Sequence, residues 1–324
     1  MSAPYRAQDV PTLYFIGVTT SRSSIMRVFP RWAQVLGIDA RIEGVDFALH
    51  DRPEHYREIV RHIKGDPHSM GALVTTHKLD LLNAAKDLFD EFGPYAKELA
   101  EISCISKRNG TLVGKAMDPI TSGLALDAFV PEAQWASGPE VLILGAGGAS
   151  LALTVNLLER AKAGKPHPAR IIVSNRSQRR LDEMESIHNR MDVDLPLEYV
   201  LSPTADGNDR LCDTLPSGSI VINATGLGKD RPGSPLSDRA AFPQGGRVWD
   251  FNYRGDLLFL EQARRQEQAR DLVIEDGWTY FIHGWTRVVS EVFQLDLPTA
   301  GPMFQRLSDE AALTRTSAKK GSQT

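Results

Sequence analysis

Val141-Leu142-Ile143-Leu144-Gly145-Ala146-Gly147-Gly148-Ala149-Ser150 is the stretch that decides the fold. Four apolar residues lead into a cluster of glycines, and a second apolar run, from Leu151 to Leu158, follows at helical spacing. This order predicts a buried parallel strand, a tight turn and a helix. The backbone N–H groups that open such a helix attract phosphate groups, so the pattern indicates a dinucleotide-binding turn.

Three positions in this turn have separate expected tasks. Gly145 permits the sharp bend, and Gly147, which has no Cβ, lets a pyrophosphate approach the backbone. Ser150 replaces the third glycine of the G-x-G-x-x-G pattern, so we expect the helix to sit slightly off its usual close packing. An ordinary strand-to-helix turn is the alternative, but the strand before and the helix after favour a dinucleotide site.

The composition is that of a globular chain with a sizeable core. Of the 324 residues, 42% are hydrophobic and 24% charged, and the length suggests two domains. The net charge of −4 argues against a broad nucleic-acid-binding surface. The chain shows neither a signal-peptide pattern nor an apolar run of about 18 residues, so we expect no membrane span.

Cysteine and histidine usage narrows the class further. Cys104 and Cys212 are the only cysteines, and two isolated cysteines fit a reducing cytoplasm better than a disulfide. The eight histidines are scattered without metal-ligand spacing. We therefore expect a cytoplasmic protein without a bound metal.

The first hundred residues alternate between strand and helix patterns, which predicts a parallel-dominated sheet. Polar residues follow two of the expected strands, Ser21 to Ser24 after the first and His77-Lys78 after the third. Gly37 is a plausible stop for the first helix. The expected strands are 13–18, 40–47 and 71–76, and the expected helices are 25–36, 56–63 and 79–92.

A hairpin and a domain boundary come next. Asn109-Gly110, a strong hairpin-turn signal, lies within a paired strand pattern from Ile102 to Val113. A helix is expected over 120–129. We place the boundary near Asp118, because the dinucleotide domain needs a helix that leads into its first strand.

The second strand of the dinucleotide domain, 169–174, decides between the two nicotinamide cofactors. An NAD site usually has an acidic residue at this strand end, where it binds the ribose 2′-hydroxyl. Here Asn175 and Arg176 occupy the place, followed by Ser177 and Arg180. Because a guanidinium pairs well with a 2′-phosphate, we expect NADP rather than NAD. Solvated arginines at a helix start are the alternative.

The remaining elements complete an alternating pattern. A loop of small residues, Thr225 to Gly228, follows the strand that ends at Asn223 and Ala224, and it allows a flat ring to lie against the backbone. Residues 317–324 are polar and basic, which predicts a disordered tail. The expected strands are 219–224, 248–253 and 272–277, and the expected helices are 257–268, 280–293 and 303–313.

Taken together, these pieces resemble the shikimate dehydrogenase family, including its quinate-using and shikimate-dehydrogenase-like branches, from about Ile16 to Phe293. The motifs that carry the resemblance are Ser21-Arg22-Ser23, Val74 to Lys78, Gly145 to Ser150, Asn175-Arg176-Ser177, Asn223 to Gly228, Asp250 to Tyr253 and Asp276-Gly277.

The resemblance implies an α/β fold of two domains with the active site in the cleft between them. Residues 12–117, completed by the C-terminal helices 279–313, would bind substrate, and 118–278 would form a doubly wound Rossmann domain. The implied activity is NADP-dependent hydride transfer on a cyclic hydroxy or keto acid, as in the shikimate pathway of aromatic amino acid biosynthesis or on quinate. We expect a small carboxylate substrate, no nucleic-acid or membrane partner, and a monomer or homodimer.

The resemblance also assigns site residues. Lys78 and Asp118 would be catalytic, since a lysine beside a carboxylate can move a hydroxyl proton as the hydride leaves. Ser21, Ser23, Thr75 and Tyr253 would contact substrate, with the two serine hydroxyls donating to its carboxylate. The cofactor would lie against Gly145, Ala146, Gly147, Gly148, Ala149, Ser150, Asn175, Arg176, Ser177, Arg180, Asn223, Ala224, Thr225, Gly226, Leu227 and Gly277.

Each assignment has a structural alternative. Lys78 taken alone is a solvated lysine at a helix start, and Asp118 is a helix cap before Pro119. The serines of the Ser21-Arg22-Ser23 loop are suited to capping the next helix. Tyr253 either presents its hydroxyl to substrate or only packs.

Three polar contacts of the family pattern are missing here. Ile105-Ser106, Ala116 and Gly284 stand where the family has polar residues that hold ring hydroxyls. Because hydroxyls without partners weaken binding, we expect a less hydroxylated ring acid than shikimate. Two other functions stay open: a nucleotide-binding regulatory protein that has lost turnover, and an enzyme such as a methylene-tetrahydrofolate dehydrogenase on a related layout.

Overall fold

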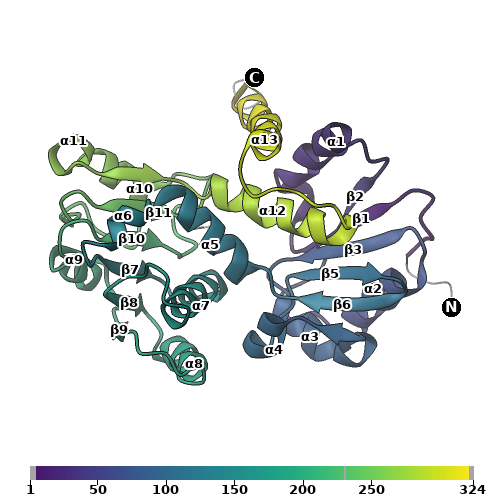
Figure 1. Cartoon of the computed structure of the whole chain (residues 1–324), viewed down its shortest axis with the longest axis horizontal. Helices are drawn as coiled ribbons and strands as arrows, with labels where there is room; N and C mark the ends of the chain where they lie inside the picture. The colour runs from purple at the N-terminus through teal and green to yellow at the C-terminus, as the bar shows by residue number, and fades with distance from the viewer. Residues whose placement is uncertain (1–4, 230, 321–324) are drawn as a thin grey trace. The chain divides into compact units, whose positions relative to one another are not determined.

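The computed structural model describes residues 5–229 and 231–320 of the chain and divides it into two compact units (Figure 1). Unit 1 contains the residues up to 117 together with those from 284 onward, and unit 2 contains residues 118–283. Helix α12, Trp278–Phe293, carries the chain from unit 2 back into unit 1.

Unit 1 is built on a mixed sheet with the strand order β2-β1-β3-β5-β6-β4. Strand β5 is antiparallel to both of its neighbours, and the other pairings are parallel. The predicted hairpin is β5–β6, and its turn residues Asn109 and Gly110 take φ values of 50° and 83°, as a tight hairpin turn requires. The strands are β1 Thr12–Gly17, β2 Arg41–Asp46, β3 Ser69–Val74, β4 Glu91–Phe92, β5 Cys104–Arg108 and β6 Thr111–Lys115.

The helices of unit 1 begin largely where the sequence indicates. Helix α1 ends at Leu36, and Gly37 adopts the left-handed cap with φ 66°. The described helices are α1 Ile25–Leu36, α2 Pro53–Gly65, α3 Lys78–Ala85, α4 Pro94–Leu99 and α13 Pro302–Lys320, with the 3₁₀ turns η1 Thr20–Arg22 and η2 Lys86–Leu88.

The single long helix expected over 79–92 is wrong. Helix α3 ends at Ala85, and Glu91 and Phe92 pair instead with Val113 and Gly114 of β6. Asp90 fixes this change of structure, because its carboxylate accepts the Leu112 backbone N–H at 2.8 Å. Pairing with a distant strand therefore overrides the local helical spacing.

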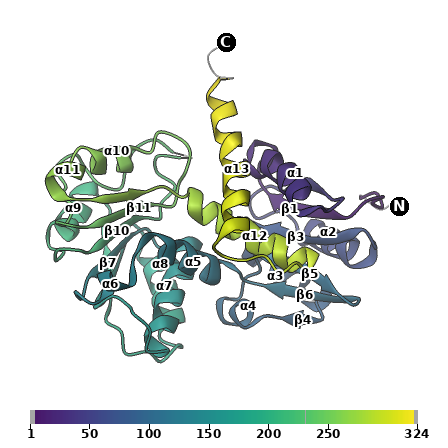
Figure 2. The same cartoon turned by 45° about the horizontal axis from the view of Figure 1, so that its top comes forward.

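The C-terminal helix α13 packs against α1 (Figure 2). The Trp32 indole donates to the Leu307 carbonyl at 2.7 Å, and Arg31 pairs with Glu310 at 2.8 Å. The helix continues to Lys320, so the disordered tail expected from residue 317 is wrong for residues 317–320. Residues 321–324 lie outside the described residues.

Unit 2 is an all-parallel sheet with the order β12-β11-β10-β7-β8-β9, the doubly wound order in which the first strand, β7, lies beside the fourth, β10. The prediction of an α/β chain with a Rossmann sheet is thereby confirmed. The strands are β7 Glu140–Leu144, β8 Arg170–Asn175, β9 Leu197–Leu201, β10 Ile220–Asn223, β11 Arg247–Asp250 and β12 Val273–Glu275.

Helices cover this sheet on both faces, as in other doubly wound domains. Helices α5 and α7 pack closely, since a Cβ on Gly123 would lie 2.2 Å from the Asn156 amide nitrogen. The sequence pattern did not predict β9 or α9. In α9 the polar Asn208 and Asp209 are themselves buried, so burial does not follow the apolar residues there. The helices are α5 Asp118–Phe129, α6 Glu132–Trp135, α7 Gly148–Lys162, α8 Gln178–His188, α9 Ala205–Asp213, α10 Leu258–Arg264 and α11 Glu267–Arg270.

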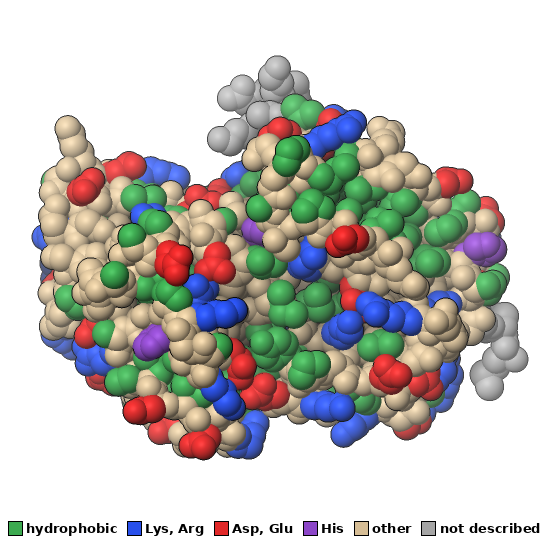
Figure 3. All heavy atoms as spheres, in the orientation of Figure 1, with side chains coloured by type: hydrophobic (Ala, Val, Ile, Leu, Met, Phe, Trp, Pro, Cys, Tyr) green, Lys and Arg blue, Asp and Glu red, His purple; other side chains and the backbone are tan. Residues whose placement is uncertain are grey.

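The described residues bear on the general expectations about membrane helices, metal sites, cysteines and surface charge. None of the described helices is long and apolar enough to cross a membrane. Within the same ranges, no group of three or more His, Cys, Asp or Glu side chains is arranged to hold a metal. Cys104 and Cys212 are buried free thiols. On the face drawn in Figure 3, acidic and basic side chains are interspersed.

Candidate active site

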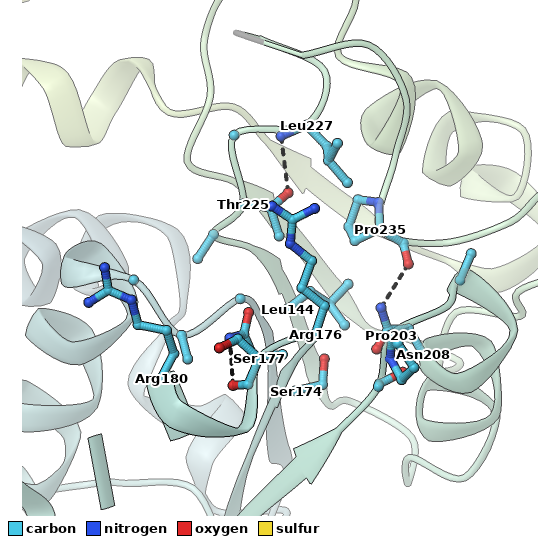
Figure 4. A pocket seen from close by; sticks show the side chains of 18 of the residues that line it. Leu144, Ser174, Arg176, Ser177, Arg180, Pro203, Asn208, Thr225, Leu227 and Pro235 are labelled. Carbon is cyan, nitrogen blue, oxygen red and sulfur yellow. Dashed lines mark hydrogen bonds between the residues drawn. The ribbon is translucent and has the colours of Figure 1, made fainter. Parts of the chain in front are cut away.

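The glycine turn opens onto a cavity of about 790 Å³ in unit 2 (Figure 4). Its walls are the loops that follow β7, β8, β9 and β10 at the carboxyl edge of the sheet. The edge between β7 and β10 is the switch point of a doubly wound sheet, where such folds bind their ligands. The cavity is therefore the candidate dinucleotide site.

The two glycines of the turn, Gly145 and Gly147, differ in their surroundings. Gly145 has φ 111°, and a Cβ there would lie 3.0 Å from the Ala224 carbonyl oxygen, so backbone packing requires glycine. A Cβ on Gly147 would meet nothing within 4 Å, so this position faces open space. Ser150 is fully buried, and its hydroxyl donates to the Gly145 carbonyl. The serine thus closes the turn at the position where the G-x-G-x-x-G pattern has its third glycine.

The cavity wall is basic. Four arginines line it, and among the described lining residues none is acidic. Arg180 is paired with Glu183 at 3.1 Å, whereas the exposed Arg176 guanidinium has no hydrogen-bond or ion-pair partner within residues 5–229 and 231–320. In the view of Figure 4, Arg176 points toward the side formed by Thr225 and Leu227. The arginines are Arg176, Arg179, Arg180 and Arg231, of which the sequence predicts only Arg176 and Arg180 as cofactor residues.

A buried polar network supports the Thr225 to Leu227 loop from below. The Asn223 amide donates to the Asp250 carboxylate at 3.1 Å, and its own oxygen accepts from the Thr225 backbone and hydroxyl. The Asn252 amide donates to the Thr225 and Leu227 carbonyls, each at 3.1 Å. Burial raises the pKa of Asp250 to about 7, although hydrogen bonds from Asn252 and Asn223 oppose the shift.

The network also ends a strand. The sequence predicted strand structure over 248–253, but β11 stops at Asp250, whose carboxylate turns back to accept the Asn252 backbone N–H at 2.8 Å. The Asp250 side chain therefore fixes the loop that follows β11, and residues 251–253 do not continue the strand.

Not all expected cofactor residues line the cavity. The lining includes Gly145, Ala146, Gly147, Asn175, Arg176, Ser177, Arg180, Ala224, Thr225, Gly226 and Leu227. Gly148, Ala149 and Ser150 form the first turn of α7, and Asn223 lies buried behind the loop. Gly277 has a packing role, since a Cβ there would lie 2.1 Å from the Phe251 carbonyl oxygen.

The hydroxyls of the Ser21-Arg22-Ser23 loop lie at the carboxyl edge of the unit 1 sheet, after β1. Ser21 is exposed and Ser23 half-buried, and neither hydroxyl has a hydrogen-bond partner in the described part of the chain. The helix-cap alternative is wrong for α1, because its N-cap is Ser24 and no side chain caps it. Both hydroxyls thus remain available to a ligand.

Lys78 is the first residue of α3, at the same edge of unit 1, after β3. Its ammonium lies 3.6 Å from the Glu101 carboxylate, and both side chains are largely buried. Lys78 is therefore not a solvated lysine. Thr75, just before this turn, donates its hydroxyl to the Ile16 carbonyl at 3.3 Å.

The neighbouring His77 fixes the turn that carries Lys78. His77 is fully buried, with Tyr56 Oη 3.0 Å from Nδ1 and the Gly17 carbonyl 3.2 Å from Nε2. A carbonyl only accepts, so Nε2 carries the proton and Nδ1 accepts from Tyr56. Because both ring nitrogens are engaged, His77 holds the ends of β1 and β3 together.

The three departures from the family pattern have clear surroundings. Ile105 is fully buried in the unit 1 core, and Ser106 donates to Glu291 at 3.0 Å. Ala116 is buried, and a Cβ on Gly284 would meet nothing within 4 Å. The Ile105 side chain thus packs in the unit 1 core, and the Ser106 hydroxyl is bonded to Glu291.

Tyr253 and Asp118 belong to unit 2. The Tyr253 ring packs at 5.3 Å from Trp278 and 5.0 Å from Phe281, so packing is established for this side chain. Asp118 is half-buried and opens α5 directly before Pro119, as a residue at a helix start would. Lys78 lies in unit 1 and Asp118 in unit 2.

Comparison with known proteins gives sequence relatives of low identity. No family model matches the chain. The chain is 27% identical over 208 residues to the NADP(+) shikimate dehydrogenase of Brucella melitensis, covering 64% of this chain and 62% of that relative. The chain thus spans about three fifths of that protein's length. A longer match, 26% over 278 residues, covers 84% of this chain and 87% of the shikimate dehydrogenase of Methylocella silvestris.

Solved structures share the fold along nearly the whole chain. Shikimate dehydrogenase from Aquifex aeolicus has a TM-score of 0.71 at 19% identity, covering 94% of this chain and 99% of its own. Quinate dehydrogenase from Corynebacterium glutamicum in complex with NAD gives 0.71 at 18%, with the same coverage. The 5-ketofructose reductase of a Gluconobacter strain gives 0.67 at 19%, covering 93% and 98%.

The sequence relatives are distant, and the structural matches extend over both units. The chain is thus a distant sequence relative of shikimate dehydrogenases, at 26–27% identity, and it shares the fold of solved shikimate and quinate dehydrogenases over nearly its whole length.

Proposed function

We propose that the protein is an NADP-dependent oxidoreductase of the shikimate dehydrogenase type, acting on a cyclic hydroxy or keto acid. The observation that carries this proposal is the cavity at the switch point of the Rossmann sheet, with four arginines and no acidic residue among its described lining. The distant relatives from Brucella and Methylocella, both NADP(+) shikimate dehydrogenases, support the same reaction class.

The cavity residues suit a phosphorylated dinucleotide. Gly147 leaves open space at the start of α7, where backbone N–H groups face an incoming phosphate. Arg176 follows β8, the position that holds an acidic residue in NAD sites, and its guanidinium has no counter-ion in the described ranges. These features favour NADP over NAD, although the Corynebacterium quinate dehydrogenase with this fold was solved with NAD.

The chemistry needs one proton carrier besides the cofactor. When bound, the nicotinamide supplies the site that accepts or donates the hydride. As the substrate carbon loses hydride and becomes a carbonyl, its hydroxyl proton passes to the neutral Lys78 amine, and in the reverse direction the Lys78 ammonium returns it. Asp118 is the second residue that we propose for this proton transfer, from the resemblance to the family.

The substrate contacts point to a carboxylate with few ring hydroxyls. The hydroxyls of Ser21 and Ser23 are available to a carboxylate. Ile105 is buried in the core and Ser106 is bonded to Glu291, so neither offers a contact to a ring hydroxyl. We therefore expect weak turnover of shikimate or quinate and better turnover of a ring acid that lacks a hydroxyl.

An absorbance screen of hydroxy acids for NADP reduction tests this proposal. NADP reduction by a ring hydroxy acid supports it. The altered substrate positions Ile105, Ala116 and Gly284 favour one alternative, a nucleotide-binding regulatory protein without turnover. That alternative predicts tight NADP binding by calorimetry with no reduction by any acid in the screen.

A further inference from the structure

The strongest unassigned feature near the proposed catalytic lysine is a second carboxylate. Glu101 is 6% exposed and lies just before β5, with its Oε1 atom 3.6 Å from Lys78 Nζ. The side chains of the pair are 17% and 8% exposed, for lysine and glutamate respectively. A charge this far from water is retained when an opposite charge lies beside it.

The backbone holds the two residues in register. The Ile102 N–H donates to the Lys78 carbonyl at 3.3 Å, so the residue after Glu101 is bonded to the lysine's own peptide. Ser103 continues this attachment, accepting from the Val74 N–H at 2.9 Å and donating to the Lys115 carbonyl at 2.9 Å. The segment that carries Glu101 is thus fixed between the end of β3 and β6.

The other face of the lysine's turn is fixed as well. His77 is locked between Tyr56 and the Gly17 carbonyl, immediately before Lys78. With the backbone held by His77 and the side chain held near Glu101, the ammonium has a defined position at the carboxyl edge of the unit 1 sheet.

We infer that Glu101 is a positioning residue for Lys78: its carboxylate holds the lysine side chain where it exchanges the substrate proton. This inference rests on the proposed function, because it assigns Glu101 a task only if Lys78 carries that proton. Glu101 itself contacts no reacting atom in this account. Its negative charge favours the ammonium form of Lys78, the form that donates a proton to a carbonyl.

The rival explanation is that the Lys78–Glu101 ion pair only stabilises the fold. Variants that change the charge of Glu101 or the length of its side chain distinguish this explanation from a positioning role. Glu101→Gln keeps the shape and removes the charge, whereas Glu101→Asp keeps the charge on a shorter side chain. Glu91→Gln is the matched control, since Glu91 is exposed on β4.

The measurement is the pH profile of kcat for carbonyl reduction, with KM and NADPH affinity recorded for each variant. We expect Glu101→Gln to lower kcat on the order of tenfold, with KM and NADPH affinity near wild type. Its alkaline limb should move to lower pH, because the proton donor loses its counter-charge. Glu101→Asp should retain more activity than Glu101→Gln, and Glu91→Gln should match wild type.

Wild-type kcat and an unmoved pH profile in both Glu101 variants would overturn the inference, as would a Gln variant more active than the Asp variant. If Glu101→Gln does not fold, Glu101→Asp decides alone, with a kcat severalfold below wild type expected and an unchanged kcat contradicting. Lys78→Ala separates this failure from that of the proposed function: an active Lys78→Ala enzyme removes the lysine as proton carrier, whatever the Glu101 variants show.

Discussion

The amide of Asn223 donates a 3.1 Å hydrogen bond to the Asp250 carboxylate, joining the ends of adjacent strands β10 and β11. Both side chains are fully buried, and with Asn252 they hold the loop from Thr225 to Leu227 that walls the cavity. A loop held by three buried side chains is pre-formed before the cofactor arrives, which lowers the cost of binding.

Removal of one support should therefore weaken cofactor binding. Asn252→Ala takes away the donor to two loop carbonyls, and we expect a loss of about 1–2 kcal/mol in NADP affinity, roughly tenfold. Isothermal titration calorimetry measures the effect. Asn189→Ala, an exposed position after α8, is the matched control. Equal NADP affinities for the two variants would show that the loop does not need this support.

The two glycines of the turn should respond differently to alanine. Gly145→Ala forces a side chain into φ 111° beside the Ala224 carbonyl, and we expect the free energy of unfolding to fall by about 1–3 kcal/mol. Gly147→Ala adds a methyl to open space, so unfolding should change by less than about 0.5 kcal/mol.

Cofactor binding separates the same pair. The added methyl at Gly147 enters the space that the pyrophosphate would occupy, so Gly147→Ala should bind NADP at least tenfold more weakly, by about 1.4 kcal/mol. Urea unfolding and NADP titration on both variants check these outcomes. A Gly147→Ala protein with wild-type NADP affinity would mean that the phosphates bind elsewhere.

Arg176 should discriminate between the cofactors. Because its guanidinium would pair with the 2′-phosphate, Arg176→Ala should weaken NADP binding by about 2 kcal/mol, roughly thirtyfold, and NAD binding much less. Arg210→Ala, an exposed arginine on α9 outside the cavity lining, serves as the control. Equal losses for NADP and NAD on direct titration would count against the 2′-phosphate assignment.

A buried histidine predicts how acid destabilises unit 2. His188 accepts or donates at both ring nitrogens, with Thr154 at 2.8 Å and Tyr199 at 2.7 Å, and burial lowers its pKa from 6.5 to about 4. Between these two pH values His188 is protonated in the unfolded chain but neutral in the folded chain. The free energy of unfolding therefore falls as the pH falls through this window, by roughly 3 kcal/mol in total.

Comparison with a variant isolates this contribution. Asp250 has the opposite effect, because its raised pKa makes the folded state hold a proton and lose stability as pH rises from 3.8 to about 7. His188→Gln removes one titration and leaves the other, so urea unfolding at pH 7 and pH 4.5 should show a weaker acid loss in the variant. The same acid loss in both proteins would refute the assignment.

The Rossmann half of the fold follows from local patterns. Strands such as Val141 to Leu144 are continuous apolar runs, and the glycine turn after them is readable in the sequence alone. The end of α3 cannot be predicted in this way, because Asp90 and Glu91 bond to residues of β6, which lies further along the chain. Contacts between segments that are distant in the sequence therefore determine where a helix such as α3 ends, which the local spacing of apolar residues does not show.

The candidate site shows the same limit. Arg176 and the Ser21-Arg22-Ser23 loop stand out by residue type beside strand ends. Glu101 does not, because an isolated acid in a sequence gives no sign that the fold buries it beside Lys78. Ser106 illustrates the reverse case: it stands where the resemblance implies a substrate contact, but its hydroxyl is bonded to Glu291 on α12.

The most direct test of the account is kcat/KM for NADP reduction by shikimate, quinate and ring acids lacking one hydroxyl, on wild type and Lys78→Ala. We predict that the less hydroxylated acid is preferred, with each missing contact costing shikimate about 1–3 kcal/mol, or roughly 5- to 150-fold. Lys78→Ala should lower the rate by at least about 100-fold. Efficient shikimate turnover, or a Lys78→Ala protein as active as wild type, would contradict the account.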